Sequence, residues 1–248
     1  MSELVLLPGW CLGRGPWRAA ATALGGRILD LPGYGDEPPV TDFTAATDAL
    51  AGRLAPGTAL CGWSLGAMLA LAIAARYPEK VGRLALVAGT ASFVQREGWP
   101  HAMAPATLAE FTAAVAADVE AMLPRFIGNF NRGDARAKAV TRALLELADP
   151  RPPAATLATG LAWLQDVDLR LLAPRVKAPT LLLHGAADPL MPLPAAEALA
   201  ALIPGARLEA FPAAAHAPFI ADPAAFHARL ADFLGVAANP CTGPAELA

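Results

Sequence analysis

The segment Gly62-Trp63-Ser64-Leu65-Gly66 has the G-x-S-x-G pattern that surrounds the serine nucleophile in many hydrolases. An apolar run, Thr58-Ala59-Leu60-Cys61, precedes it, and a helix-forming stretch, Ala67 to Arg76, follows it, so the pattern predicts a turn between a strand and a helix. Glycine on both sides of Ser64 allows a turn sharp enough to expose the hydroxyl, because a Cβ there would clash. The same pattern recurs by chance in ordinary glycine-rich turns, so the interpretation depends on partners for Ser64.

A serine becomes nucleophilic when a histidine takes its proton and a carboxylate orients the histidine. On a strand-turn-helix scaffold these partners follow in the order Ser, Asp, His, each at the carboxyl end of a later strand. The strand pattern Thr180–His184 leads into a loop with Asp188, and the strand pattern Arg207–Phe211 leads into a loop with His216. We therefore predict that Ser64, Asp188 and His216 form a catalytic triad. Asp188 precedes a proline, so the alternative for it is a purely structural turn.

The three remaining histidines have weaker functional cases. His184 ends a strand pattern, and we expect it to be packed or hydrogen-bonded. We expect His101, in a loop, and His227, in a helical stretch, to be exposed. The four histidines show no H-x-x-x-H spacing, so we predict no metal site, and the triad chemistry needs no cofactor.

A tetrahedral oxyanion needs two hydrogen-bond donors. The residue after the nucleophile supplies one through its backbone N–H, here Leu65, and the loop after an early strand supplies the other. The apolar run Leu4–Leu7 is followed by Pro8-Gly9-Trp10, so we predict the N–H of Trp10 as the second donor. The Trp10 indole is expected to wall the acyl pocket, with simple core packing as the alternative.

Strand and helix patterns alternate along the chain, which predicts an α/β fold with a mostly parallel sheet covered by helices on both faces. The region 93–172 breaks this rhythm because it is nearly all helix-forming, and we interpret it as a helical lid inserted into a hydrolase core made of 1–92 and 173–236. The tail, 237–248, is expected to be disordered. The expected strands are Leu4–Leu7, Arg27–Leu31, Ala59–Cys61, Leu84–Ala88, Thr180–His184 and Arg207–Phe211.

The composition suits a compact soluble enzyme: 248 residues, 55% hydrophobic, with a net charge of −3. The acidic balance argues against a general nucleic-acid surface. Apolar stretches are too short to span a membrane, and no secretory signal pattern is visible, so we expect a cytoplasmic protein. We also expect a monomer. The odd cysteine count, Cys11, Cys61 and Cys241, argues against a disulfide framework, and Cys61 is expected to be a buried apolar residue.

The motifs together resemble the α/β-hydrolase superfamily and, within it, the esterases that cleave the methyl ester of pimeloyl-acyl carrier protein in biotin synthesis. The resemblance covers nearly the whole chain. One departure is Pro8, which stands where many relatives have histidine before Gly-Trp. The motifs that carry the resemblance are Pro8-Gly9-Trp10, Asp30-Leu31-Pro32-Gly33-Tyr34-Gly35, Gly62-Trp63-Ser64-Leu65-Gly66, Glu97-Gly98-Trp99-Pro100, Asp166-Val167-Asp168-Leu169-Arg170, the Asp188 loop and His216-Ala217-Pro218-Phe219-Ile220.

This resemblance implies a lid that contacts both the acyl chain and the carrier protein. The strip that matches the family's acyl contacts is Phe126, Ile127, Gly128, Asn129 and Phe130, although these residues could equally be core. Among the lid cations Arg125, Arg132, Arg136, Lys138 and Arg142, three match the family's basic positions, namely Arg125, Lys138 and Arg142. The resemblance implies that these three meet an acidic acyl carrier protein. The alternative is an ordinary solvated face.

The predicted function is that of a serine carboxylesterase acting on the methyl ester of pimeloyl-acyl carrier protein. The nearer alternative is a short-chain carboxylesterase or a carbon–carbon bond hydrolase with a small free substrate. The more distant one is a non-catalytic ligand-binding protein on the same scaffold.

Overall fold

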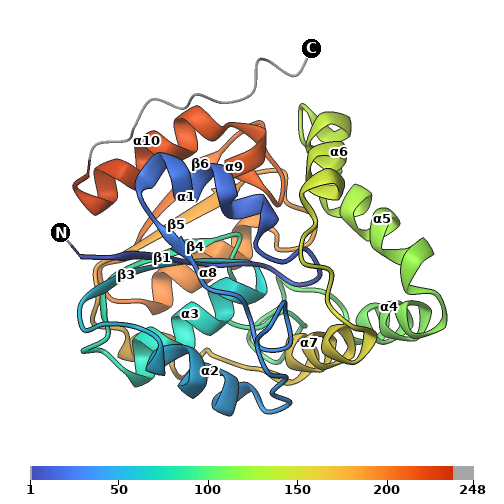
Figure 1. The fold of residues 1–248 in the computed structure, drawn as a ribbon, viewed down its shortest axis with the longest axis horizontal. Helices are drawn as coiled ribbons and strands as arrows, with labels where there is room; N and C mark the ends of the chain where they lie inside the picture. The colour runs from blue at the N-terminus through green and yellow to red at the C-terminus, as the bar shows by residue number, and fades with distance from the viewer. Residues whose placement is uncertain (1, 237–248) are drawn as a thin grey trace.

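A single six-stranded sheet forms the centre of the computed structural model, which describes residues 2–236. The strand order is β2-β1-β3-β4-β5-β6, and every neighbouring pair is parallel (Figure 1). The inner strands are mostly apolar, as strands covered on both faces of a sheet require. The strands are β1 (Leu4–Leu7), β2 (Arg27–Ile28), β3 (Thr58–Trp63), β4 (Val81–Val87), β5 (Thr180–Gly185) and β6 (Arg207–Phe211).

Helices cover both faces of this sheet (Figure 1). One face carries α1 (Arg18–Leu24) and α10 (Pro223–Leu234), and the other carries α2 (Phe43–Gly52), α3 (Leu65–Arg76) and α8 (Leu193–Leu202). Helix α3 is buried from Leu65 to Ala75, and its many alanines let it approach β3 and β4 closely. Three short helical turns, η1 (Gly15–Trp17), η2 (Ala173–Arg175) and α9 (Pro218–Ala221), complete the core.

Between β4 and β5 the chain leaves the core and forms four helices at the carboxyl ends of the strands (Figure 1). They are α4 (Pro105–Ala117), α5 (Val119–Phe130), α6 (Ala137–Leu147) and α7 (Ala154–Asp166). We call these four helices and their connections the lid. All four lie inside the predicted insertion, 93–172, whose boundaries stay a prediction.

The segments that enter and leave the lid are joined to each other. Ser92 and Asp168 form an isolated antiparallel bridge, and the Leu169 amide donates to the Ala91 carbonyl at 2.8 Å. The Arg96 guanidinium donates to the Gln165 carbonyl at 2.8 Å. The lid is therefore attached to the sheet by one paired stem.

The predicted fold class is confirmed, with corrections in detail. The strand expected over Arg27–Leu31 ends at Ile28, because this edge strand pairs only with β1 and the chain then turns so that Asp30 can meet Arg14. His227 is buried at 5% exposure, so the expectation that it is exposed was wrong: it lies on the face of α10 that also buries Phe226 and Leu230. Cys241 and the tail 237–248 lie outside the described residues.

None of the helices within residues 2–236 combines the length and the apolar character that crossing a bilayer requires.

The turn from β3 into α3 is sterically demanding. Ser64 has φ 56° and ψ −119°, a conformation that non-glycine residues rarely adopt. A Cβ on Gly62 would lie 2.2 Å from the Gly66 carbonyl oxygen, and a Cβ on Gly66 would lie 2.4 Å from the Pro8 carbonyl oxygen. Glycine at both positions is therefore required by backbone atoms, which cannot move aside as a flexible side chain can.

We predict that Gly62→Ala lowers the free energy of unfolding by at least about 2 kcal/mol, because the added methyl overlaps the backbone. Gly52→Ala is the matched control, since a Cβ on Gly52 meets nothing within 4 Å. This control should leave stability unchanged or raise it by up to about 1 kcal/mol. Urea unfolding of both variants is the measurement, and equal stability of the two would contradict the steric account.

Candidate active site

Ser64 lies at the carboxyl end of β3, directly before the first residue of α3. Its amide donates to the Val87 carbonyl at 2.9 Å, which extends the ladder between β3 and β4 by one residue. The side chain is largely covered, with 8% of the residue exposed. The strained turn thus presents Ser64 at the edge of the sheet that faces the lid.

The predicted acid and base are hydrogen-bonded to each other. His216 Nδ1 and Asp188 Oδ2 are 2.7 Å apart, and both residues are buried. Asp188 Oδ1 accepts from the amides of Leu190 and Met191 at 2.9 and 3.0 Å. Asp188 is thus held by three donors, which offset the cost of burying a carboxylate.

His184 contacts the loop that carries Asp188. Its Nε2 lies 2.6 Å from the Met191 carbonyl oxygen and 3.7 Å from Asp188 Oδ2. Burial lowers the pKa of the His184 imidazole, and the neutral ring donates to Met191 from Nε2. The expectation that His184 is packed and hydrogen-bonded is confirmed.

The two loops that carry Asp188 and His216 are in backbone contact. The Ala187 amide donates to the Ala214 carbonyl at 3.0 Å. At Gly185 a Cβ would lie 1.8 Å from the Ala215 carbonyl oxygen, so only glycine permits this approach. The short distance between acid and base therefore depends on a close backbone packing between the ends of β5 and β6.

His216 is also fixed by aromatic side chains. The Trp63 indole Nε1 donates to the His216 carbonyl at 2.9 Å. The imidazole centroid lies 5.7 Å from the Trp63 ring and 5.0 Å from the Phe130 ring, which comes from lid helix α5. The core and the lid each supply one aromatic wall for the histidine.

A narrow space of about 10 Å³ joins the predicted residues. Ser64, His216 and Trp10 all line it, so the structure brings nucleophile, base and predicted oxyanion loop together. Its remaining walls come from the oxyanion loop, the core and the lid: Gly9, Trp63, Phe93, Phe126, Phe130, Leu164 and Leu190.

Of the two predicted oxyanion donors, Trp10 lines this space, and Leu65 directly follows Ser64, which also lines it. Leu65 is the first residue of α3, where the backbone N–H groups have no acceptor within the helix. Among residues 2–236, neither the Leu65 nor the Trp10 amide donates to a protein acceptor. The Trp10 indole Nε1 donates to the Leu157 carbonyl in α7 at 3.0 Å, which fixes the loop under the lid.

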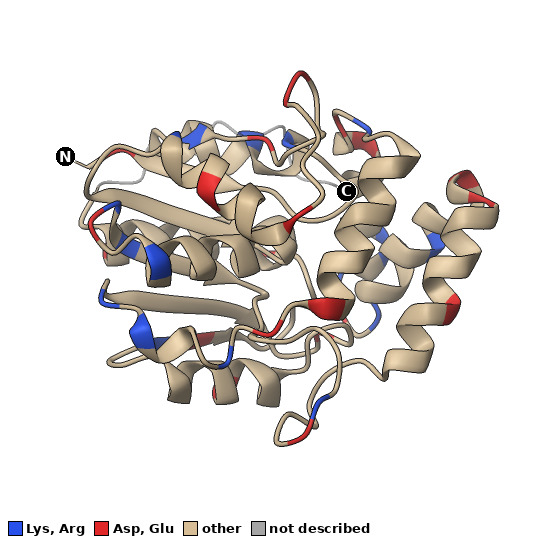
Figure 2. Cartoon of the chain, turned by 90° about the horizontal axis from the view of Figure 1, so that it is seen from below, with Lys and Arg blue, Asp and Glu red and all other residues tan. Residues whose placement is uncertain are grey.

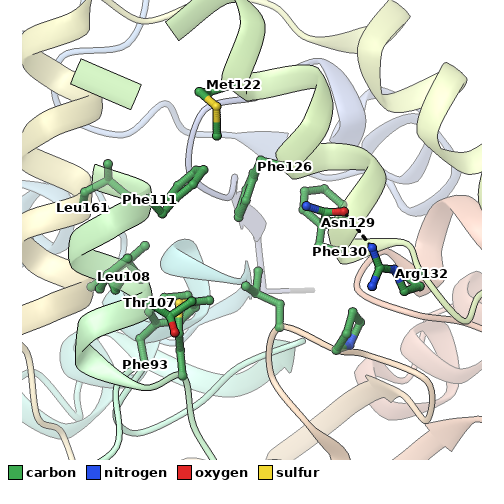
Figure 3. Close-up of a pocket in the computed structure, with 14 residues that line it drawn as sticks. Phe93, Thr107, Leu108, Phe111, Met122, Phe126, Asn129, Phe130, Arg132 and Leu161 are labelled. Atoms are coloured by element: carbon green, nitrogen blue, oxygen red, sulfur yellow. Dashed lines mark hydrogen bonds between the residues drawn. The ribbon is translucent and has the colours of Figure 1, made fainter. Parts of the chain in front are cut away.

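A larger cavity of about 310 Å³ adjoins the narrow space and shares five of its walls, Phe93, Phe126, Phe130, Leu164 and Leu190. Figure 3 shows Phe111, Met122 and Phe126 directed into it from α4 and α5, with Leu161 from α7 beside Phe111. The polar lining consists of Thr107, Asn129 and Arg132, and the last two are joined by a hydrogen bond of 3.2 Å. Most of the lining is therefore apolar, as an alkyl chain would require.

The residues predicted to contact the acyl chain lie on different sides of helix α5. Phe126, Asn129 and Phe130 line the large cavity. Ile127 is buried without lining it, and Gly128 faces a groove on the other side of α5, together with Lys138 and Arg142. The structure thus brings three of the five strip residues to the cavity.

The predicted carrier-contact residues lie on the outer side of the lid. Lys138 and Arg142 are exposed and line the same surface groove between α5 and α6. Arg125 is exposed one helical turn before Gly128, which also lines the groove. Acidic residues also occur on the lid (Figure 2), and Glu146 lies in the groove itself.

Three residues near the site were missed by sequence reasoning. Trp63 was noted only as part of a motif, although its indole holds the His216 backbone. His184 was given no role near Asp188, and Asp134, a buried lid residue bonded to the Ala215 amide, was not considered. The only sequence signal for Asp134 is its Asn-Arg-Gly-Asp turn context, which does not reveal a partner 81 positions away.

Similarity to known proteins extends over most of the chain. A family model described as the alpha/beta hydrolase family matches residues 4–229. The chain is 41% identical to a pimeloyl-[acyl-carrier protein] methyl ester esterase of Aromatoleum aromaticum, over 89% of this chain and 93% of that protein. It is 38% identical to the protein of the same name from Chromobacterium violaceum, over 94% of each chain. The fold is also that of an esterase from Exiguobacterium antarcticum, with a TM-score of 0.85 at 23% identity, covering 95% of this chain and 92% of that one.

We predict that Ser64→Ala and His216→Ala fold with an unchanged melting temperature but lose nearly all hydrolysis of a methyl ester. Asp188→Asn should lower kcat about 10⁴-fold, because the amide favours the wrong imidazole tautomer. The measurement is steady-state turnover combined with thermal unfolding. More than a few per cent of wild-type turnover in folded Ser64→Ala would show that another residue is the nucleophile.

Proposed function

Because the chain belongs to the alpha/beta hydrolase family, we propose that it is a serine carboxylesterase that removes the methyl ester from pimeloyl-acyl carrier protein in biotin synthesis. The observation that carries the proposal is the hydrogen bond between Asp188 and His216, together with the narrow space that His216 and Ser64 both line beside an apolar cavity. The names of the relatives support the choice of substrate, and the arrangement of Ser64, Asp188 and His216 supports the type of reaction.

Hydrolysis proceeds in two steps. Ser64 Oγ attacks the ester carbonyl while His216 Nε2 takes the hydroxyl proton, and Asp188 stabilises the imidazolium through Nδ1. The amides of Trp10 and Leu65 stabilise the tetrahedral oxyanion. His216 then returns the proton to the departing methoxy oxygen, so methanol leaves and an acyl-enzyme remains. Water, deprotonated by His216, attacks the acyl-enzyme and releases the carboxylate and Ser64.

The sizes of the two spaces fit a methyl ester of a longer acid. The space beside Ser64 has a volume of about 10 Å³, which leaves little room around the reacting carbonyl and favours an ester with a small alcohol group. The neighbouring cavity of about 310 Å³ suits the methylene chain of the acyl group. At about 0.8 kcal/mol per buried CH₂, a chain of about five methylene groups gains roughly 4 kcal/mol there.

The outer face of the lid fits an acidic partner. The chain has a net charge of −3, yet exposed cations gather at the groove between α5 and α6. A small neutral ester gains nothing from such a surface. An acidic carrier protein gains faster association, because complementary charge raises the rate of encounter.

The experiment that tests the function compares the pimeloyl methyl ester on acyl carrier protein with the same methyl ester free in solution. We expect a much higher kcat/KM for the carrier-bound ester. Equal values would favour the small-substrate esterase, and no turnover of either ester would favour a binding protein. Labelling of Ser64 by a fluorophosphonate separates these last two cases.

We predict that changing Arg125, Lys138 and Arg142 together to glutamate lowers kcat/KM for the carrier-bound ester about tenfold or more at low salt. The same variant should lose most of the salt dependence of this rate, since the attraction it removes is the part that salt screens. Hydrolysis of the free ester should stay within about twofold of wild type.

The matched control changes Arg175, Lys177 and Arg207 to glutamate. These exposed residues lie just before β5 and at the start of β6, at the edge of the sheet opposite the lid, and the change in net charge is the same. The control should keep the carrier-dependent rate. If both triple variants lose the same share of kcat/KM for the carrier-bound ester, the cause is the overall charge of the protein. If the lid variant loses none, its three cations only face solvent.

A further inference from the structure

The connection between α5 and α6 rests on the loop that carries His216. Asp134 in this connection is 7% exposed, and its Oδ2 accepts from the Ala215 amide at 2.9 Å. Its Oδ1 accepts from the Arg136 amide at 2.7 Å. A single lid carboxylate is therefore bonded both to its own turn and to the residue directly before the predicted base.

Neighbouring lid residues strengthen the same contact. The Ala135 amide donates to the Ala213 carbonyl at 2.9 Å, and Arg136 Nη1 donates to the Ala221 carbonyl at 3.2 Å. Gly133, at φ 95°, leaves space where a Cβ would come within 3.2 Å of the Ala187 Cβ in the loop before Asp188. The lid connection thus touches the loops of both the acid and the base.

The backbone around His216 is held from two directions. On one side the Trp63 indole binds the His216 carbonyl oxygen, and on the other Asp134 binds the Ala215 amide. A carboxylate bound to a backbone N–H is a strong, charge-assisted hydrogen bond, and its loss leaves a buried amide without an acceptor. The His216 backbone is then held on the Trp63 side only, and the imidazole keeps its bond to Asp188 and its ring contacts.

We propose that Asp134 is a positioning residue for His216, acting through the Ala215 amide, so that the lid holds the catalytic base as well as covering the acyl cavity. This rests on the proposed function only in taking His216 as the general base. A displacement of a catalytic group by about 1 Å can lower a rate about 100-fold, so the expected effect is on kcat.

The competing explanation is that Asp134 only stabilises the lid helices. Asp118 offers a matched control, because it accepts from the Ala121 amide at 3.0 Å at the start of α5, in the same lid and also through Oδ1. Asp118 is exposed, and its hydrogen bonds to Ala114, Ala121 and Met122 stay within α4 and α5. Removing it weakens the lid without touching the His216 loop.

The experiment compares wild type with Asp134→Ala, Asp134→Asn and Asp118→Ala. Substrates are a free methyl ester with a long acyl chain and a chromogenic acetate, whose acyl group is too small to need the large cavity. We expect Asp134→Ala to lose about 10- to 100-fold in kcat on both substrates, with KM within about twofold. Asp134→Asn should lose less, because it keeps one acceptor oxygen for the two amides that Asp134 binds. Asp118→Ala should keep kcat on both.

A second measurement does not depend on turnover. The proton between His216 Nδ1 and Asp188 Oδ2 should give a downfield NMR resonance in wild type and in Asp118→Ala, absent from His216→Ala. In the Asp134 variants this resonance should broaden or shift. Asp134→Asn keeps the side-chain volume, so it remains informative if Asp134→Ala does not fold.

Wild-type kcat with an unchanged downfield resonance in Asp134→Ala, or in Asp134→Asn if Asp134→Ala does not fold, would overturn the proposal. So would a loss confined to the KM of the long-chain ester, since that is the expected result of a damaged cavity. If wild type hydrolyses neither ester, the proposed function fails, and the resonance alone still decides whether Asp134 positions His216.

Discussion

The hydrogen bond between His216 Nδ1 and Asp188 Oδ2 is the interaction on which the site depends, because it joins loops from two different strands inside a buried region. Burying a carboxylate is costly unless its oxygens are satisfied. Two backbone amides and the imidazole satisfy Asp188, and these donors are in place only when β5 and β6 end at the same level of the sheet. The parallel register of the sheet therefore sets the geometry of acid and base.

Several features of the structure could be predicted from the sequence because their cause lies in residues close together in the chain. The glycines around Ser64 are needed by a turn of a few residues, and the order of Ser64, Asp188 and His216 follows from strands that the apolar runs reveal. Gly185 has the same steric importance as Gly62, yet no local pattern marks it. Its constraint comes from the Ala215 carbonyl, which only the folded sheet brings near.

Two of the three residues that sequence reasoning missed have partners distant in the chain. The Trp63 indole finds its acceptor 153 positions away, and Asp134 finds the Ala215 amide 81 positions away. The error on His227 has a similar origin, because the face of α10 that is buried depends on packing against the core. The local sequence pattern predicts whether a segment is a helix or a strand. Which face of that helix or strand is buried depends on the segments that pack against it.

A row of aromatic side chains connects the cavity of about 310 Å³ with His216. Phe111 stacks on Phe126 with ring centroids 4.9 Å apart, Phe126 meets Phe130 at 5.2 Å, and Phe130 meets His216 at 5.0 Å. Such pairs favour defined relative orientations, so a shift of one ring is felt by the next. Phe130 lines the cavity of about 310 Å³ and also packs against the imidazole of His216, so one side chain contributes both to the shape of the cavity and to the position of the predicted base. Exchanging the lid for one of different acyl preference would therefore alter the surroundings of His216 even if Ser64, Asp188 and His216 were all retained.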